Sequence, residues 1–449
     1  MKWILLAIAL AGVLPLAGWL RRNPHGHPKI WALLGCLPFL VTALPRLEAA
    51  LIGWPTWPGM SKGIEISALD VLTLAIYLSL PHARRPLPFR ASMGFYFAVV
   101  LLSAIQAAVP FAVFFYTWQL GRVFLVYAVV ARACADERVS IWLLKGMAVG
   151  LCFEACVVVW ERVTFGAIQA AGTFGHQNLL GIASHFVIFP FFALLLAGER
   201  GWWPVVTTLA GAIIAALTAS RATIGLVAVG LTLVFALSAV RRWTVQVTRV
   251  ALLAPVALAV LSSLALSSLQ ERFTAQPLSE YDERAALITA SAMMLSDRPM
   301  GVGANNFAVV NNTAGYAVRA EVDLPGRGAL VHNIYWLALA ETGYLGLLAL
   351  IILLTRPLIV AVRCWWQFAG DRRAGLMIGF TTSLLIIYVH SYFEWVFLTI
   401  QIQYLFAMTV GMVAALAQQM GYWGRANLQV SSGARLPATV IGGAGVQKR

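Results

Sequence analysis

The sequence predicts an all-α polytopic membrane protein with about twelve transmembrane helices and one long external loop that contains helical segments. Of its 449 residues, 60% are hydrophobic and only 11% are charged, and the mean hydropathy is +0.81. Because soluble domains carry about 25% charged residues, this composition excludes an ordinary soluble fold. A spanning helix needs about 20 apolar residues, so roughly a dozen spans would use nearly the whole chain.

Thirteen apolar runs of spanning length follow one another along the chain. They lie at residues 3–20, 30–46, 64–81, 91–109, 112–131, 141–160, 180–197, 204–219, 223–240, 250–268, 332–354, 374–392 and 398–417. The first run also resembles the apolar core of a signal peptide, although Arg21 and Arg22 follow it without a small-residue cleavage site. The first two runs are therefore not both expected to cross independently. We expect twelve spans with both chain ends inside; thirteen spans with an external N-terminus is the alternative.

The formal net charge of +14 lies largely in alternate connections between these runs. Basic clusters follow the first, ninth and eleventh runs, for example at Arg22, Arg241 and Arg372. Short loops with an excess of Lys and Arg stay in the cytoplasm. The charge therefore indicates membrane topology rather than nucleic-acid binding, and it makes the intervening connections external, including residues 269–331.

Four regions follow from this topology. They are transmembrane helices at 1–268, the long external loop at 269–331, C-terminal transmembrane helices at 332–417, and a cytoplasmic tail at 418–449. The loop contains five arginines and seven acids, a net charge of −2, so no positive excess holds it inside. Its first half, 270–295, has the apolar spacing of a helix lying against the membrane, ended by Pro299. The Gly/Ala/Ser-rich composition of the tail predicts disorder.

Three ionisable residues near the external face are candidates for catalysis, since charge at membrane depth is costly and usually functional. Arg221 lies between two apolar runs with almost no loop, Arg284 lies in the long loop, and His332 begins the eleventh run. Alternatively, Arg221 is an anchor that reaches lipid headgroups, and Arg284 forms a weak ion pair with Asp282 or Glu283 within the loop. A lone histidine is more often a satisfied core residue than a catalyst.

Seven further residues are candidates for substrate binding. They are Arg122, His176, Asn178, Asn333, Tyr335, His390 and Glu394. Arg122 lies in the middle of the fifth run, too deep for its charge to reach the membrane surface easily. It is expected either to contact a phosphate of the substrate or to pair with an acid such as Glu154.

The other external candidates also have two interpretations each. His176 and Asn178 either line a path for the substrate or stabilise a structural turn. A second group lies at the external end of the twelfth run, and consists of His390, Tyr392, Glu394 and Trp395. Such a group either binds sugar or belongs to the aromatic belt that membrane proteins place at the interface.

His332 begins the most specific motif in the chain. His332-Asn333 is followed by nine residues, Gly343, two residues and Gly346. On a continuous helix, Gly343 and Gly346 return to within about 20° and about 40° of His332, which directs the imidazole toward the bundle. Glu341 falls on the opposite face, so it is a poor candidate to orient the imidazole. The motif resembles the H[NSQ]-x9-G-xx-[GTY] signature of the O-antigen ligase family of bacterial lipopolysaccharide synthesis.

The resemblance extends from about residue 60 to 417. Arg221, in a short external turn, and Arg284, ahead of the Pro-x-Gly-x-Gly turn at 299–303, lie where that family keeps its essential arginines. Residues 172–178 resemble the external segment that this superfamily carries before its central spans. The first two runs fit the family poorly.

What the resemblance implies is a C-type (GT-C) glycosyltransferase of the bacterial inner membrane with its active site facing the periplasm. Such an enzyme transfers a glycan from undecaprenyl diphosphate to lipid A–core, with inversion at the anomeric carbon. The residue types agree, because the guanidinium groups of Arg221 and Arg284 match phosphate oxygens and His332 can act as general base. No metal-binding pattern occurs in the sequence, so neither a metal nor another cofactor is expected. Expected partners are the lipid-linked glycan, lipid A–core and membrane lipids, without nucleic acid.

Two kinds of alternative stay open. An O-antigen polymerase or a protein O-oligosaccharyltransferase would use the same donor, although the single His-Asn motif favours ligation. A polysaccharide or lipid transporter belongs to a different class. It should show midplane charges and repeated halves, whereas the candidates here gather at one face.

Overall fold

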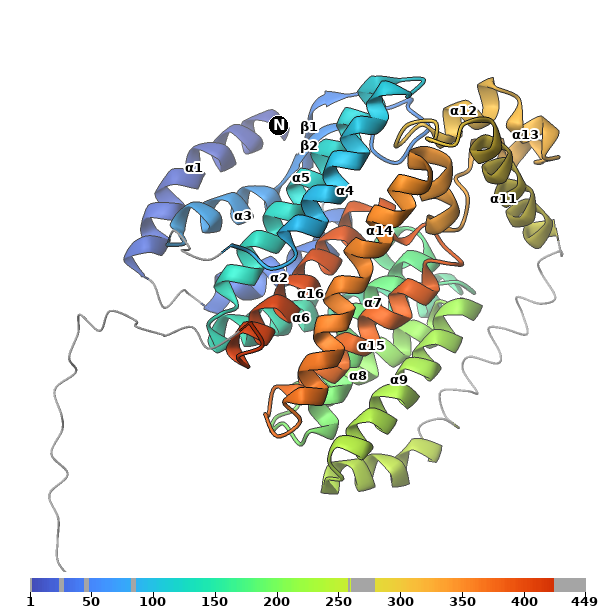
Figure 1. Cartoon of the computed structure of the whole chain (residues 1–449). Coiled ribbons are helices and arrows are strands. Elements are labelled where there is room, and N and C mark those ends of the chain that lie inside the picture. The colour runs from blue at the N-terminus through green and yellow to red at the C-terminus, as the bar shows by residue number, and fades with distance from the viewer. Residues whose placement is uncertain are drawn as a thin grey trace, which may run out of the picture.

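Long apolar helices packed side by side form the body of the protein, and shorter helices cover one end of it (Figure 1). The computed structural model describes residues 2–23, 28–43, 48–81, 86–256, 259 and 279–423. Apart from one small hairpin, the regular structure in these ranges is helical. The predicted all-α membrane class is thus confirmed, with the hairpin as an addition.

The first half of the chain supplies one side of the bundle. Its helices are α1 (Lys2–Arg22), α2 (Pro28–Ala43), α3 (Ala68–Ser79), α4 (Arg90–Leu102), α5 (Pro110–Ala133) and α6 (Glu137–Phe165), with the short helix η2 (Ser103–Ile105) after α4. The hairpin strands β1 (Glu48–Gly53) and β2 (Gly63–Ser67) precede α3.

The remaining helices complete the bundle and form its cap. Its helices are η3 (Gly172–Phe174), α7 (Gln177–Leu196), α8 (Trp203–Leu217), α9 (Arg221–Arg241), an unlabelled helix at Val245–Val256, α11 (Ser279–Asp297), α12 (Phe307–Thr313), α13 (Tyr316–Arg319), η4 (Leu324–Gly328), α14 (Ile334–Gln367), α15 (Ala374–His390), η5 (Val396–Leu398) and α16 (Ile400–Gln419).

Among the residues described, six helices are long and apolar enough to cross a membrane: α5, α6, α7, α9, α14 and α16. Six further apolar helices are shorter, at 10–17 residues. The multi-pass membrane character is confirmed, and the count of twelve spans stays a prediction.

The arginine-rich turns meet at one end of the bundle, which we call the inner end. Arg372, before α15, pairs with Glu137 at the start of α6 (2.5 Å). Arg241, at the end of α9, donates to a backbone carbonyl of the α14–α15 turn (2.8 Å). Gln419, at the end of α16, donates to the carbonyl of Cys134 (2.6 Å). This gathering of basic turns agrees with the positive-inside rule; we call the opposite end the outer end.

The start of α1 and the end of α16 lie at opposite ends of the bundle (Figure 1), and the expected placement of both chain ends inside stays a prediction. Arg21 donates to the carbonyl of Leu78 (3.0 Å), which joins the end of α1 to the end of α3. The N-terminus therefore lies beside β1 and β2 (Figure 1).

The external connection before α3 contains a structure that the apolar runs do not indicate. β1 and β2 pair antiparallel, with an irregularity between Ala50 and Ile52. Ser67 then begins α3 with a capping box, in which its hydroxyl accepts from the amide of Asp70 and the Asp70 carboxylate accepts from the amide of Ser67. The hairpin thereby brings two acids, Glu48 and Glu65, toward the bundle.

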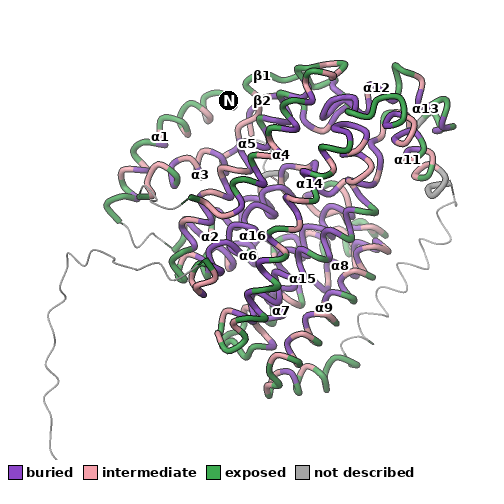
Figure 2. The backbone as a smooth tube through the Cα atoms, in the orientation of Figure 1, coloured by how far each residue is buried: buried purple, intermediate pink, exposed green. Residues whose placement is uncertain are grey.

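The core lies around α7 and α16. In each, 89% of the apolar span is buried inside the protein, against 28% for α9 at the edge. Figure 2 shows the same contrast, with buried chain through the middle of the bundle and exposed chain along α1. A helix that is apolar all round belongs in the interior. Polar groups carried by α7 are therefore held rigidly.

The helix α11 of the long loop packs one face on protein. The buried side chains of α11, Leu287, Ala290 and Met294, form one stripe, and α11 packs against α14. A helix ending before Pro299, as expected over 270–295, is confirmed from Ser279 onward, and its expected contact with the membrane surface stays a prediction. The first part of that prediction, and most of the tail at 418–449, lie outside the described residues.

Candidate active site

A break in α14 replaces the continuous helix that the His-Asn-x9-Gly motif predicts. Gly343 has φ 67° and ψ −167°, a conformation that glycine alone adopts without strain. The break frees the backbone carbonyl oxygens of Ala340 and Glu341 in the turn before it. The amide of Val302 donates to Ala340 (2.9 Å), and the amide of Gly303 donates to Glu341 (2.8 Å). A Cβ at Gly343 would lie 2.3 Å from the carbonyl oxygen of Pro299. The motif glycine therefore lets the 299–303 turn dock against α14.

His332 lies outside the helix, so its predicted position on the same helical face as Gly343 and Gly346 is wrong. Helix α14 begins at Ile334, and Asn333 is its N-cap. The Oδ1 of Asn333 accepts from the amides of Tyr335 (3.0 Å) and Trp336 (3.1 Å). Such caps typically contribute about 1 kcal/mol.

The start of α14 is also joined to the end of α15. The amide of Ile334 donates to the carbonyl of Ser391 (3.0 Å), and the hydroxyl of Tyr335 donates to the carbonyl of Tyr388 (2.8 Å). The cap oxygen of Asn333 and the hydroxyl of Tyr335 thus form hydrogen bonds with the protein's own backbone. Both residues therefore have a positioning role. Their contacts hold His332 beside residues 391–395.

Three polar side chains from distant parts of the chain meet at the carboxylate of Glu394. His332 Nδ1 lies 3.0 Å from Glu394 Oε2. On the other carboxylate oxygen, Arg284 Nη2 lies at 3.1 Å and Asn178 Nδ2 at 2.6 Å. Arg284 also donates to the carbonyl of Phe393 (3.1 Å). The sequence-predicted residues His332, Arg284, Asn178 and Glu394 therefore form one cluster at the outer end.

The exposed fractions of the side chains show that Glu394 lies deepest in this cluster. The Glu394 side chain is 4% exposed, whereas His332 is 23% and Arg284 28% exposed. Burial alone would raise the pKa of the Glu394 carboxyl, but the hydrogen bond from His332 and the charges of His332 and Arg284 hold that pKa below its ordinary value. An ionised carboxylate only accepts hydrogen bonds. His332 Nδ1 must then donate, so the lone pair of the imidazole's neutral tautomer lies on Nε2.

Aromatic rings border the cluster. The rings of His332 and His176 each lie 6.1 Å from the ring of Trp395. His176 is also the N-cap of α7, since its Nδ1 accepts from the amide of Asn178 (3.3 Å). The structural interpretation of His176 is thus confirmed, and its position beside Trp395 also places it near the catalytic candidates.

Arg221 starts α9, which is held tightly against α7. Ser220 caps the helix through the amide of Thr223 (3.3 Å). A Cβ at Gly181 of α7 would lie 2.0 Å from Thr223 Oγ1, so the two helices approach closely there. Gly181 follows Asn178 by one helical turn. The structure therefore brings Arg221 to the outer end beside the α7 turn that carries Asn178.

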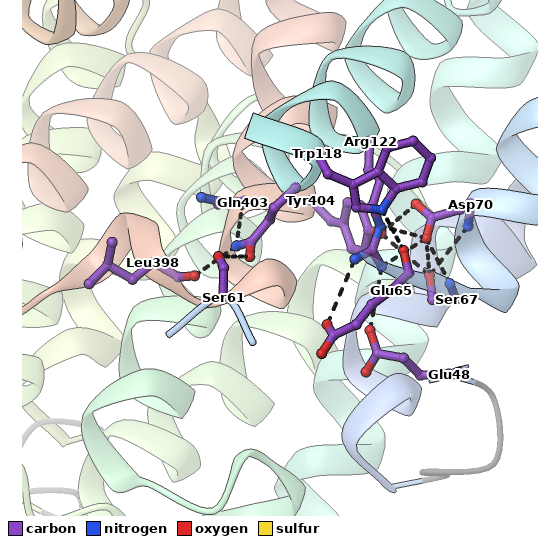
Figure 3. A network of polar contacts seen from close by, with 11 residues as sticks. Glu48, Ser61, Glu65, Ser67, Asp70, Trp118, Arg122, Leu398, Gln403 and Tyr404 are labelled. Atoms are coloured by element: carbon purple, nitrogen blue, oxygen red, sulfur yellow. Dashed lines mark hydrogen bonds and ion pairs between the residues drawn. The ribbon is translucent and has the colours of Figure 1, made fainter. Parts of the chain in front are cut away.

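Arg122 belongs to a separate buried network (Figure 3). Its side chain is 5% exposed and lies 2.8 Å from Asp70, 3.4 Å from Glu48 and 3.9 Å from Glu65. Tyr404 donates to Asp70 (2.5 Å) and places its ring under the guanidinium. Burial and the neighbouring Glu48 raise the pKa of Glu65.

The prediction that Arg122 pairs with an acid is confirmed, but its named partner is wrong. Glu154 instead accepts from the amide and the hydroxyl of Thr173. The acids that do pair with Arg122 come largely from the hairpin, which no apolar run indicates. Since three carboxylates already surround Arg122, a substrate phosphate there would meet negative charge, and the phosphate interpretation loses its support.

His390 is a core residue, so the expectation that it binds sugar is wrong. Its exposure is 0%, and its Nδ1 lies 3.1 Å from Nε2 of His185, which is also fully buried. The last turn of α15 packs on α7, which removes His390 from any substrate path. Sequence reasoning missed His185 because it lies inside an apolar run. It also missed Glu394 as the shared partner of His332 and Arg284; the only signal was an acid at the external end of a span.

Fold and site define a multi-pass membrane protein whose polar cluster lies at one end of the bundle. Residues 206–351 match the model of the O-antigen ligase family. That region runs from α8 to α14 and includes Arg221, Arg284 and the His332 motif, so the resemblance carried by that motif is confirmed. The match supports an assignment to the O-antigen ligase family and a ligase- or polymerase-type function in O-antigen biosynthesis. No curated protein matches the chain.

Proposed function

We propose that this protein is an O-antigen ligase: a GT-C glycosyltransferase that moves a glycan from undecaprenyl diphosphate to lipid A–core. The reaction takes place at the periplasmic side of the bacterial inner membrane. The observation that carries the proposal is the contact between His332 Nδ1 and Glu394 Oε2 at 3.0 Å. It supports a tautomer in which Nδ1 carries the proton that Glu394 accepts and Nε2 is the nitrogen able to take a proton from the acceptor.

His332 acts as general base in this proposal. The acceptor hydroxyl loses its proton as it attacks the anomeric carbon, and Nε2 receives that proton. A positioned base typically contributes about 10²–10⁴-fold. Glu394 holds the imidazole in the required tautomer and stabilises the imidazolium that forms, which is the role of the carboxylate in a catalytic triad.

Arg284 and Arg221 stabilise the leaving diphosphate. Cleavage of the bond between the anomeric carbon and the phosphate oxygen transfers negative charge to that oxygen. Guanidinium groups match phosphate oxygens through paired hydrogen bonds. Arg284 contacts the carboxylate that orients His332, which supports a diphosphate bound in the same cluster as the base, on the opposite face of the anomeric carbon. The ring of Trp395, between His176 and His332, offers an aromatic face for the sugar.

The acceptor separates the ligase from its nearest alternatives. Purified protein is incubated with undecaprenyl-diphosphate glycan and, in separate reactions, lipid A–core, free glycan-lipid or a peptide. Extension of lipid A–core alone is the expected result. Extension of glycan-lipid would identify a polymerase, and extension of the peptide a protein oligosaccharyltransferase. No extension, with glycan-lipid moved across a vesicle membrane, would identify a transporter.

A further inference from the structure

A cavity of about 630 Å³ opens at the inner end of the bundle, far from the His332 cluster. Its apolar wall comes from four helices: Leu144 on α6, Phe191 on α7, Leu376 on α15 and Leu416 on α16. A cavity with such a wall accepts a hydrocarbon chain, because burial of apolar surface is favourable.

The rim of the cavity is cationic. Four basic side chains, Lys145, Arg200, Arg372 and Arg373, line it together with two acids, Glu137 and Glu199. Arg372 is paired with Glu137 and Arg373 with Asp371. Within the described part of the chain, neither Lys145 nor Arg200 forms an ion pair with a carboxylate. Four cations against two acids leave the lining of the cavity with a net positive charge.

Lys145 is the least expected of these cations. It lies eight residues after Glu137, which is about 12 Å along α6 from the inner end. Its side chain is half-buried, and its ammonium lies 4.6 Å from the ring centre of Trp142. A cation at that depth is costly without an anionic partner. The cavity is the place where such a partner would bind.

Tryptophans mark the depth of the opening. Trp203 lines the cavity and stacks on Trp202, with ring centres 4.2 Å apart. Tryptophan concentrates at the boundary between headgroups and acyl chains. The cationic rim thus lies at the headgroup level of the inner leaflet, and the apolar wall lies at the level of the acyl chains.

We propose that this cavity binds an anionic phospholipid of the inner leaflet. Its phosphate would contact Lys145 and Arg200, and an acyl chain would lie against the apolar wall. Basic pockets between transmembrane helices on the cytoplasmic side are a known form of lipid recognition, and each Lys or Arg near an anionic surface contributes about 1 kcal/mol. Charge complementarity selects this occupant over a zwitterionic lipid.

The test titrates purified full-length protein in detergent with phosphatidylglycerol or phosphatidylcholine and counts bound lipid by native mass spectrometry. Phosphatidylglycerol should bind about tenfold more tightly than phosphatidylcholine. K145Q/R200Q should lose about tenfold in phosphatidylglycerol affinity. K145R/R200K should retain it, which separates charge recognition from misfolding. The matched control R138Q/R363Q removes the same charge at the same end of the bundle, outside the cavity, and should bind as the unaltered protein does.

Three results would overturn the proposal. One is equal affinity for the two lipids. Another is equal loss of binding in the cavity and control variants. The third is displacement of phosphatidylglycerol by millimolar inorganic phosphate, which would make the cavity a site for free phosphate.

Discussion

His332 and Glu394, 62 residues apart in the chain, meet through Nδ1 and Oε2 at 3.0 Å. The carboxylate is nearly inaccessible, and the imidazole faces the opening of the cluster. This relationship gives Glu394 a role distinct from sugar binding, because it determines which imidazole nitrogen carries the proton.

Glu394→Gln should lower the rate of glycan transfer by at least about 100-fold, toward the loss seen when a triad carboxylate becomes an amide. The amide permits the wrong histidine tautomer and no longer stabilises the imidazolium. Steady-state transfer should show the loss mainly in kcat. Glu137→Gln, at the inner end, is the control and should leave kcat unchanged. An active Glu394→Gln enzyme would mean that the carboxylate does not orient the base.

Glu394 also makes folding stability depend on pH. Its folded-state pKa lies below the ordinary value, so the ionised form stabilises the folded state. This contribution is complete above the ordinary glutamate pKa of about 4.3 and is lost as the pH falls through the lower folded-state value. Thermal unfolding from pH 7 to pH 3 should therefore show a steeper loss of Tm for the unaltered protein than for Glu394→Gln. Equal slopes would contradict the assigned direction of the pKa shift.

Gly343→Ala should destabilise the protein by about 1–3 kcal/mol, because an L-residue is strained at this φ and ψ and the new Cβ meets the carbonyl of Pro299. Gly121→Ala is the matched control: it lies inside α5, and its new methyl group would have no neighbouring atom within 4 Å. That substitution should be neutral or stabilising. Chemical unfolding in detergent measures both, and similar effects of the two would refute a special backbone role for Gly343.

Arg122→Ala should destabilise the protein by about 3–5 kcal/mol, since it leaves buried carboxylates without their counter-charge. Arg319→Ala removes an exposed pair with Asp297 and should cost at most about 1 kcal/mol. Unfolding of both variants provides the comparison. If Arg122→Ala instead folded normally and lost only donor affinity, the guanidinium would be a phosphate ligand after all.

Much of the fold could be predicted from local pattern. Apolar runs predict the helices, and the clusters at Arg241 and Arg372 predict which helix ends meet. The β1–β2 hairpin could not be predicted, because its strands are five or six residues long and depend on the bundle for stability. The orientation of α1 was also open, since an apolar helix has no direction of its own.

The site was predictable in its residue types and less so in its contacts. The His332 motif identifies the base candidate, but periodicity assumes a continuous helix, and Gly343 breaks it. Glu394 meets His332 only because α15 packs on α14, and no spacing in the sequence predicts that packing. The packing of α15 on α7 buries His390 against His185, so a histidine near the outer face became a core residue.

The central claim is that His332 transfers a proton rather than binding the donor. Single-turnover glycan transfer and donor binding are measured together on purified His332→Ala protein, with undecaprenyl-diphosphate glycan and lipid A–core. We expect transfer to fall by at least about 100-fold while the Kd for the donor stays within about twofold, since no charge that contacts the diphosphate is removed. Transfer at the normal rate, or a loss explained entirely by weaker donor binding, would contradict the account.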